Sequence, residues 1–183
     1  MTIDLETAIR RRRMHRDFED RKVSPEDIDK MLWAVGRAQQ GRPGVRNVIV
    51  VDDPVLMKTA RQVFPGFMDN NAQAMFILCS DLSVPAISSY AGREHLTRID
   101  AGAACAHLGL MAQELGMGVC TITSWTHGAV RELFGIPNHL RPDVTVIMGY
   151  PTAKQKLGVK GKQYLPAIYY NEYGVSYQQE QNR

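Results

Sequence analysis

The chain has 183 residues, of which 44% are hydrophobic, and this size and composition suit one compact domain spanning residues 1–183. Its formal net charge of +3 and its pI near 8.8 are only mildly basic, which disfavours a dedicated nucleic-acid binder. The sequence shows neither a secretory signal nor a run of about 18 apolar residues, so we expect a cytoplasmic protein without a membrane span.

The first predicted element is a helix over residues 4–13 whose end is rich in positive charge. Five of the seven residues from position 10 to position 16 are arginines. A helix dipole favours cations at the C-terminal end, so an ordinary solvated surface is one interpretation of this cluster. The other is a site for an anion, either a nucleic-acid backbone or the phosphate of a cofactor. The hydrophobic Phe18 that follows looks buried, which favours the cofactor.

Helices and strands alternate in the next part of the chain. Ser24 followed by Pro25 and two acidic residues is typical of a helix start, and the short β-branched run at 48–51 predicts a buried strand. Asp53 and Pro54 then begin a third helix, and residues 74–79 predict a second strand. The polar stretch over residues 83–97 is interpreted as a mobile connection.

The second half of the chain begins with its most hydrophobic helix, predicted over residues 100–115 and expected to lie at the centre of the fold. Gly116 ends this helix, and a strand follows over 119–123. A short helix through Val130 and Phe134 precedes a fourth strand over 144–148. We expect the later tyrosines to pack against the body or a second subunit: Tyr164, Tyr169, Tyr170, Tyr173 and Tyr177.

The reactive side chains do not form a recognisable catalytic set. The three cysteines are far apart and lie in apolar runs, which favours buried thiols over a disulfide, a redox pair or a zinc site. The five histidines have no metal-ligand spacing, and His107 is interpreted as a hydrogen-bonded core residue. We assign no histidine a catalytic role, and we predict no metal site.

Three segments, in order, resemble the FMN-dependent nitroreductase family. Residues 12–18, Arg-Arg-Met-His-Arg-Asp-Phe, are similar to a family element that clamps the flavin phosphate. Residues 100–120 are similar to the family's long central helix, its glycine turn and the following strand. Residues 146–151, Val-Ile-Met-Gly-Tyr-Pro, and a basic pair at 160 and 162 are similar to a third element.

The resemblance implies an α+β fold, with a mixed, mainly antiparallel sheet flanked by helices, in a homodimer that binds FMN at its interface. It implies NAD(P)H as electron donor and a small electron-poor acceptor, such as a nitroaromatic or a quinone. Flavin N5 would carry the chemistry, so no catalytic side chain is needed. The residues expected at the flavin are Arg12, Arg13, Met14, Arg16, Thr121, Ile122, Thr123, Ser124, Lys160 and Lys162.

The sequence departs from the family pattern before the first strand. Gln40 and Arg42 stand where the family often has other polar contacts, so we expect these two side chains at the flavin pyrimidine. Met14 replaces a usual serine and removes one hydroxyl contact to the phosphate. Tyr90 and Trp125 are expected in the substrate pocket, although core packing is an equal alternative for Trp125.

Two other functions remain open on the sequence. A specialised branch of the same superfamily, such as one that destroys flavin or removes halogens reductively, would share these motifs. A protein without enzymatic activity could instead hold flavin as a sensor or bind nucleic acid through the arginines. We favour the oxidoreductase, with no nucleic-acid partner.

Overall fold

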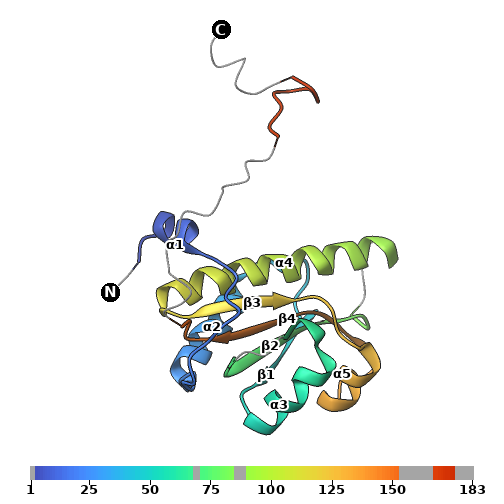
Figure 1. Cartoon of the computed structure of the whole chain (residues 1–183). Helices are drawn as coiled ribbons and strands as arrows, with labels where there is room; N and C mark the ends of the chain where they lie inside the picture. Colours follow the sequence, from blue (N-terminus) through green and yellow to red (C-terminus); the bar gives the residue numbers. More distant parts are fainter. Residues whose placement is uncertain (1–2, 68–70, 85–89, 153–166, 176–183) are drawn as a thin grey trace.

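The structure is a computed structural model that describes residues 3–67, 71–84, 90–152 and 167–175 (Figure 1). Every helix and strand predicted from the sequence is present, and a short 3₁₀ turn is added. The elements are α1 (Leu5–Arg11), α2 (Pro25–Arg37), β1 (Arg46–Val51), α3 (Pro54–Val63), η1 (Pro65–Phe67), β2 (Ala74–Asp81), α4 (Tyr90–Glu114), β3 (Gly118–Ile122), α5 (His127–Phe134) and β4 (Leu140–Gly149).

The four strands form one sheet in the order β1-β2-β4-β3, and all three strand pairs are antiparallel. The parallel component that was expected is a single bridge between Met14 and Val119, at the β3 edge. Helices α2 and α4 cover one face of the sheet, and α3 and α5 lie on the other (Figure 1). The predicted α+β class, with a mainly antiparallel sheet flanked by helices, is therefore confirmed.

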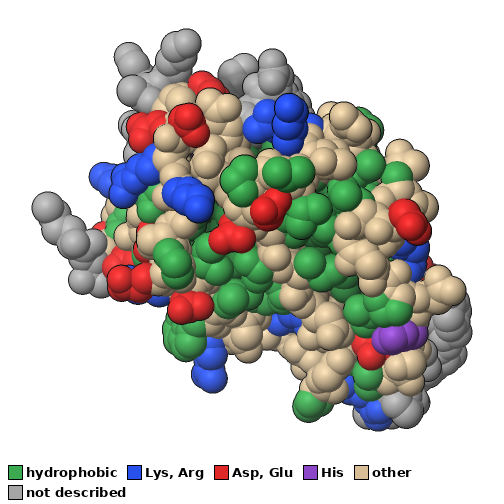
Figure 2. Space-filling view, turned by 90° about the horizontal axis from the view of Figure 1, so that it is seen from below, with side chains coloured by type: hydrophobic (Ala, Val, Ile, Leu, Met, Phe, Trp, Pro, Cys, Tyr) green, Lys and Arg blue, Asp and Glu red, His purple; other side chains and the backbone are tan. Residues whose placement is uncertain are grey.

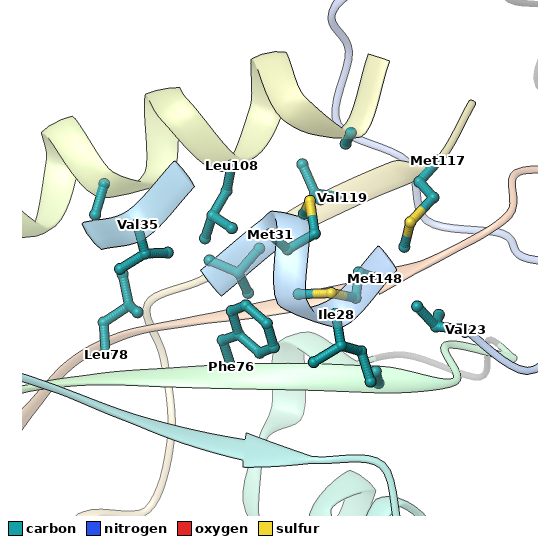
Figure 3. Packing of buried hydrophobic residues seen from close by; sticks show 14 of the residues in the cluster. Val23, Ile28, Met31, Val35, Phe76, Leu78, Leu108, Met117, Val119 and Met148 are labelled. Carbon is teal, nitrogen blue, oxygen red and sulfur yellow. The ribbon is translucent and has the colours of Figure 1, made fainter. Parts of the chain in front are cut away.

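A separate apolar cluster fills each face of the sheet. Figure 3 shows the α2–α4 side, where Met31 and Leu108 meet Phe76 and Met148 from the strands. On the other side, Phe64 and Phe67 pack against Ile77 and further buried residues. Strand residues alternate between the two clusters, because successive side chains of a strand point to opposite faces.

The helix starts form as the sequence indicated. The Ser24 hydroxyl accepts the backbone N–H of Asp27 at 3.1 Å, so it satisfies one of the donors that begin α2. The carboxylate of Asp53 accepts the backbone N–H groups of Val55 and Leu56 at 2.9 and 2.8 Å at the start of α3. The hydrogen bond predicted for His107 is present, since its Nδ1 lies 3.2 Å from the carbonyl oxygen of Ala34, and the residue is half-buried.

The central helix is longer than predicted, because α4 begins at Tyr90 and not near residue 100. The interpretation of residues 83–97 as a connection is therefore wrong from Tyr90 onward. The first turns of α4 are polar, and they carry an i,i+4 ion pair between Glu94 and Arg98 at 2.7 Å. Thr97 and Asp100 are its buried positions there, so a search for an apolar stripe misses this part of the helix.

Strand β4 also extends beyond its prediction, because it begins at Leu140 and contains Pro142. Proline cannot donate a hydrogen bond within a sheet and is normally confined to edges and bulges. Here Pro142 is paired with Cys79 at the point where the register between β2 and β4 shifts. The irregular register accommodates the proline and leaves charged residues on both sides of it.

The arginine-rich segment leaves α1 early and joins the edge of the sheet. Helix α1 ends at Arg11, and the backbone N–H of Arg12 caps it by donating to the carbonyl of Ala8 at 3.0 Å. The backbone N–H of His15 then donates to the carbonyl of Val119 at 2.9 Å. Phe18 is 1% exposed, as its sequence context indicated.

The side chain of His15 is buried over the start of β3. A Cβ atom placed on Gly118 would lie 2.5 Å from Cγ of His15, so only glycine fits beneath this ring. Burial lowers the pKa of His15 below its ordinary value of 6.5. The neutral imidazole is therefore the form that suits this position.

The cysteines were predicted to be buried thiols, and the later tyrosines were predicted to pack against the body or a second subunit. Cys79 and Cys120 are buried free thiols, and the free thiol of Cys105 is half-buried. Tyr169, Tyr170 and Tyr173 are exposed, and the rings of Tyr169 and Tyr173 lie tilted to each other with centroids 4.6 Å apart, so packing of these three side chains against the body is not observed. Packing against a second subunit stays a prediction, and Tyr164 and Tyr177 lie outside the described residues.

Within the described ranges of the chain, there is neither a helix long and apolar enough to cross a membrane nor a cluster of three or more metal-ligating side chains.

Replacing Gly118 with alanine tests the close approach of His15. We expect Gly118→Ala to lower the free energy of unfolding by about 1–3 kcal/mol, the usual cost of overpacking a core. Gly36→Ala is the matched control, since Gly36 lies in α2 and a Cβ there would meet nothing within 4 Å. Urea unfolding of both variants gives the comparison, and equal stability of the two would contradict the packing described for His15.

The buried His15 should also make stability depend on pH. Because its folded pKa is lowered, the unfolded chain binds the proton more readily, so protonation favours unfolding. We expect the contribution of His15 to the free energy of unfolding to be constant above about pH 6.5. This contribution should decline as the pH falls below that value, until the pH has passed the folded pKa. His15→Phe keeps a ring without the titration, and urea midpoints between about pH 5 and 8 should show a smaller slope for it.

Candidate functional site

A cavity of about 510 Å³ lies between α4 and the strand ends of β3 and β4, within the size range of small-molecule sites. Two threonines of the β3 end, an aromatic pair and several charged residues surround it. Its lining residues are Arg98, Ala101, Gly102, Cys105, Thr121, Thr123, Trp125, His127, Arg141, Pro142, Asp143 and Val144.

The end of β3 places two of its four predicted flavin residues at the cavity. Thr121 is half-buried, Thr123 is exposed, and both line the cavity. Ile122 belongs to the apolar cluster on the opposite face of the sheet, so only its backbone is available on the cavity side. Ser124 is exposed and follows Thr123, but it is not among the lining residues.

The arginine-rich segment runs beside this strand. The Thr121 hydroxyl donates a hydrogen bond to Sδ of Met14 at 3.5 Å, so Met14 touches a cavity residue directly. Burial raises the pKa of the Cys120 thiol, and the nearby positive charge of Arg16 partly opposes this effect. Arg12 reaches α4, where a Cβ on Gly109 would lie 3.0 Å from Cδ of Arg12.

Arg13 has a local structural contact as well. Its guanidinium donates to the carbonyls of Arg10 and Arg12 at 3.0 and 2.9 Å, which supports the end of α1. The predicted phosphate residues Arg12, Arg13, Met14 and Arg16 therefore lie on one short segment along β3 and α4. Lys160 and Lys162 lie outside the described residues.

Gln40 and Arg42 lie on a loop that is tied to α4. The side-chain amide of Gln40 donates to the carbonyl of Arg42, and the backbone N–H of Gly41 donates to the carboxylate of Asp100 at 2.7 Å. Gln40 lines a second, small cavity, and Ala101 and Asp143 line both cavities. The loop therefore adjoins the larger cavity without being part of its lining.

Arg46 fixes the same loop from β1. Its Nη1 donates to the backbone carbonyls of Val35 and Ala38 at 2.8 and 3.3 Å. Its Nη2 donates to the backbone carbonyls of Gln39 and, at 3.0 Å, of Asp100. The first two carbonyls belong to the C-terminal end of α2, where a cation is favoured. Burial lowers the pKa of Arg46, because removing a guanidinium from water disfavours its charged form.

A buried ionic network forms one wall of the large cavity. The Asp143 side chain is 3% exposed and binds Arg141, with Nε and Oδ1 separated by 2.8 Å. Arg141 also lies 3.2 Å from the carboxylate of Glu94 and donates to the Thr97 hydroxyl at 2.6 Å. Ser80 donates a further hydrogen bond to Asp143. The wall is therefore polar with opposite charges in contact, as buried charges require.

Sequence reasoning missed this network, because it placed the start of β4 at residue 144. The run Arg141-Pro142-Asp143 directly before an apolar strand was the available signal. The partner residues come from α4 and β2, so the pairing itself follows only from the fold.

Trp125 and His127 close the cavity near the start of α5. Trp125 packs against Phe64 with ring centroids 6.1 Å apart, so it touches the core and lines the cavity at once. Its Nε1–H donates to Nδ1 of His127 at 3.1 Å. Trp125 was expected at the pocket from the sequence, whereas no role was expected for His127. Tyr90 begins α4, and its side chain is outside what the structure describes.

The cavity supplies hydrogen-bond donors and a ring surface, and its thiol is not poised as a nucleophile. Burial raises the pKa of Cys105 to about 11, so the thiol is protonated at neutral pH. The described lining residues therefore suit binding and orienting a ligand, and they do not form a nucleophile with an adjacent base.

The sequence is similar to proteins of known family. The family model described as "Nitroreductase family" matches residues 9–150. A protein of Archaeoglobus fulgidus, named "Putative NADH dehydrogenase/NAD(P)H nitroreductase", is 34% identical over 146 residues, which is 76% of this chain and 81% of that protein. A protein of the same name from Methanothermobacter thermautotrophicus is 32% identical over 158 residues, covering 81% of this chain and 78% of the relative.

Solved structures show the same fold at lower identity. A nitroreductase family protein of Clostridium difficile 630 superposes with a TM-score of 0.79 at 21% identity, covering 93% of this chain and 99% of that one. An FMN-dependent nitroreductase of Clostridium difficile R20291 gives a TM-score of 0.76 at 21% identity, covering 92% and 100%. The fold, the order of the three motif segments and the family match over residues 9–150 all point to the same family. This chain belongs to the nitroreductase family.

Proposed function

We propose that the protein is an FMN-dependent NAD(P)H oxidoreductase that reduces a small electron-poor acceptor of the nitroaromatic or quinone type. Membership of the nitroreductase family and the NAD(P)H nitroreductase names of its relatives support an oxidoreductase. The description of one structural neighbour as FMN-dependent supports the choice of flavin.

One observation carries the proposal: the contact between Met14 and Thr121 joins the arginine-rich segment to the wall of the cavity. A cofactor that has an anionic end and a planar end needs a cationic segment beside a partly apolar cavity. The guanidinium groups of Arg12 and Arg16 come from the same short segment as Met14, and guanidinium forks bind phosphate with charge-assisted hydrogen bonds. The residues present therefore fit FMN.

Each predicted residue then has a defined task. Arg12, Arg13, Arg16, Lys160 and Lys162 would hold the phosphate, and the backbone of residues 121–124 would lie at the isoalloxazine ring. Gln40 and Arg42 would face the pyrimidine edge from the loop that Asp100 anchors. Bound FMN supplies the transfer of electrons as hydride, and the protein supplies position, electrostatics and exclusion of water.

The acceptor would lie in the same cavity, beside Trp125. Its aromatic ring offers a flat apolar surface that suits a planar acceptor. The ion pairs of Arg141 with Asp143 and Glu94 keep this wall polar but balanced in charge, so the cavity does not demand a charged substrate. Tyr90, at the start of α4, would also contact the acceptor.

The proposal includes one domain over residues 1–183, a cytoplasmic location and a homodimer with FMN at its interface. Support for the dimer comes from exposed apolar side chains on two helices that contact each other, α1 and α4. Leu5 and Ile9 of α1 are 65% and 57% exposed, and Leu96 and Ile99 of α4 are 47% and 46% exposed. Apolar surface of this kind favours association.

The flavin is tested first by the visible absorption of the purified protein. We expect bands near ~450 nm that bleach when NADH or NADPH is added anaerobically, because a bound flavin accepts hydride from these donors. Mass spectrometry of the released chromophore should identify FMN. A colourless protein that also fails to take up added FMN would rule out the proposed function.

The phosphate site is tested by replacing Arg12 and Arg16 together with alanine. Each charge-assisted hydrogen bond contributes about 1.5–3 kcal/mol, so we expect FMN affinity to fall by about 100-fold or more. The matched control is Arg10→Ala with Arg11→Ala, which removes the same charge from exposed positions of α1. Titration of the apoprotein with FMN, followed by flavin fluorescence, gives both affinities, and equal losses would mean that only overall charge matters.

A further inference from the structure

Trp125 and His127 form a pair whose hydrogen bond defines the state of the histidine ring. The indole Nε1–H is a donor only, so Nδ1 of His127 must accept, at 3.1 Å, and carry no proton. The neutral ring then has its proton on Nε2.

The position of His127 is also tied to the core through Trp125. The indole ring stands edge-on to Phe64, which is fully buried, and it packs against the apolar cluster on the α3–α5 side of the sheet. The imidazole ring lies edge-on to the indole, with centroids 5.4 Å apart. Two contacts between the same side chains, one polar and one between rings, restrict how the imidazole can turn.

Both residues line the large cavity, and the arginines and the aspartate of the same lining take part in ion pairs. Arg98 pairs with Glu94, and Arg141 pairs with Asp143 and Glu94. Among the described residues, the hydrogen bond of the His127 imidazole goes to Trp125 and not to that network. Nε2–H is then the ring's remaining donor, on a residue that lines the cavity.

We propose that His127 is a specificity-determining residue, whose Nε2–H donates a hydrogen bond to an oxygen of the planar acceptor beside Trp125. This inference rests on the proposed function and adds the substrate feature that the site reads, a carbonyl or nitro oxygen on an aromatic ring. Trp125 acts as a positioning residue for His127 as well as a surface for the acceptor. A structural role alone, sealing the core at the start of α5, predicts no dependence on that oxygen.

Two probes of nearly equal shape separate these roles. Para-acetylbenzyl alcohol carries a carbonyl oxygen where para-isopropylbenzyl alcohol carries a methyl group, and neither probe needs to be reduced. Binding of each to the protein as purified is measured by calorimetry without any electron donor. A net hydrogen bond contributes about 0.5–1.5 kcal/mol, so we expect His127→Phe to weaken the carbonyl probe about two- to tenfold and to leave the isopropyl probe unchanged.

Three further variants sharpen the comparison. His127→Gln places an amide N–H near the position of Nε2, so it should restore most of the preference for the carbonyl probe. Trp125→Phe keeps a ring but removes the donor that fixes His127, so the preference should fall without vanishing. His139→Phe changes an exposed histidine outside the cavity lining and should leave both affinities as they are.

The outcomes separate this inference from the proposed function. Equal losses for both probes, no loss for either, or no binding of the carbonyl probe to the unaltered protein would each overturn the role of His127. A loss of FMN affinity in His127→Phe as large as the loss for the carbonyl probe would assign the residue to the cofactor and overturn it as well. Visible absorbance of the same samples reports flavin content independently, so a protein without flavin contradicts the proposed function while the probes still test His127.

Discussion

The hydrogen bond from the backbone of His15 to the carbonyl of Val119 fixes the relation between the arginine-rich segment and the sheet. Gly118 permits it, because any side chain there would collide with the buried imidazole. The segment touches β3 at Met14 and His15 and reaches Pro151 by Phe18, while the other end of β3 lines the cavity. The positive charges of this segment are thereby held beside a strand whose far end lines the cavity, although the segment's own arginines are not among the lining residues.

One wall of the cavity depends on charges that neutralise each other. Asp143, Arg141 and Glu94 come from β4 and α4, and their contacts hold the helix against the strands at the cavity. Arg46 does the same for the loop that carries Gln40, through backbone carbonyls. Burying such groups is costly unless each finds partners, so their complete pairing stabilises the shape of the cavity. The face of the molecule seen from below in Figure 2 carries hydrophobic side chains with charged groups of both signs among them.

Local signals in the sequence predicted most of the fold, because capping residues such as Ser24 and β-branched runs act within a few positions. The resemblance to the nitroreductase family, and not a local signal, pointed to Thr121 and Thr123, and the strand-end position pointed to Trp125; all three line the cavity. The first turns of α4 and the start of β4 were missed, since their buried positions are polar and become satisfied only by distant partners such as Ser80. His127 carried no spacing signal, and its significance follows from its contact with Trp125.

The length of α4 has a geometric consequence for any ligand of this site. Arg12 touches the helix at Gly109, whereas the cavity is lined by residues of the same helix from Arg98 to Cys105. An α-helix rises about 1.5 Å per residue, so these points lie roughly 6 to 16 Å apart along one axis. The helix therefore sets the distance between the Arg12 contact and the cavity. A molecule that engages both ends must be elongated, with its charged group and its planar part held apart by a linker of matching reach.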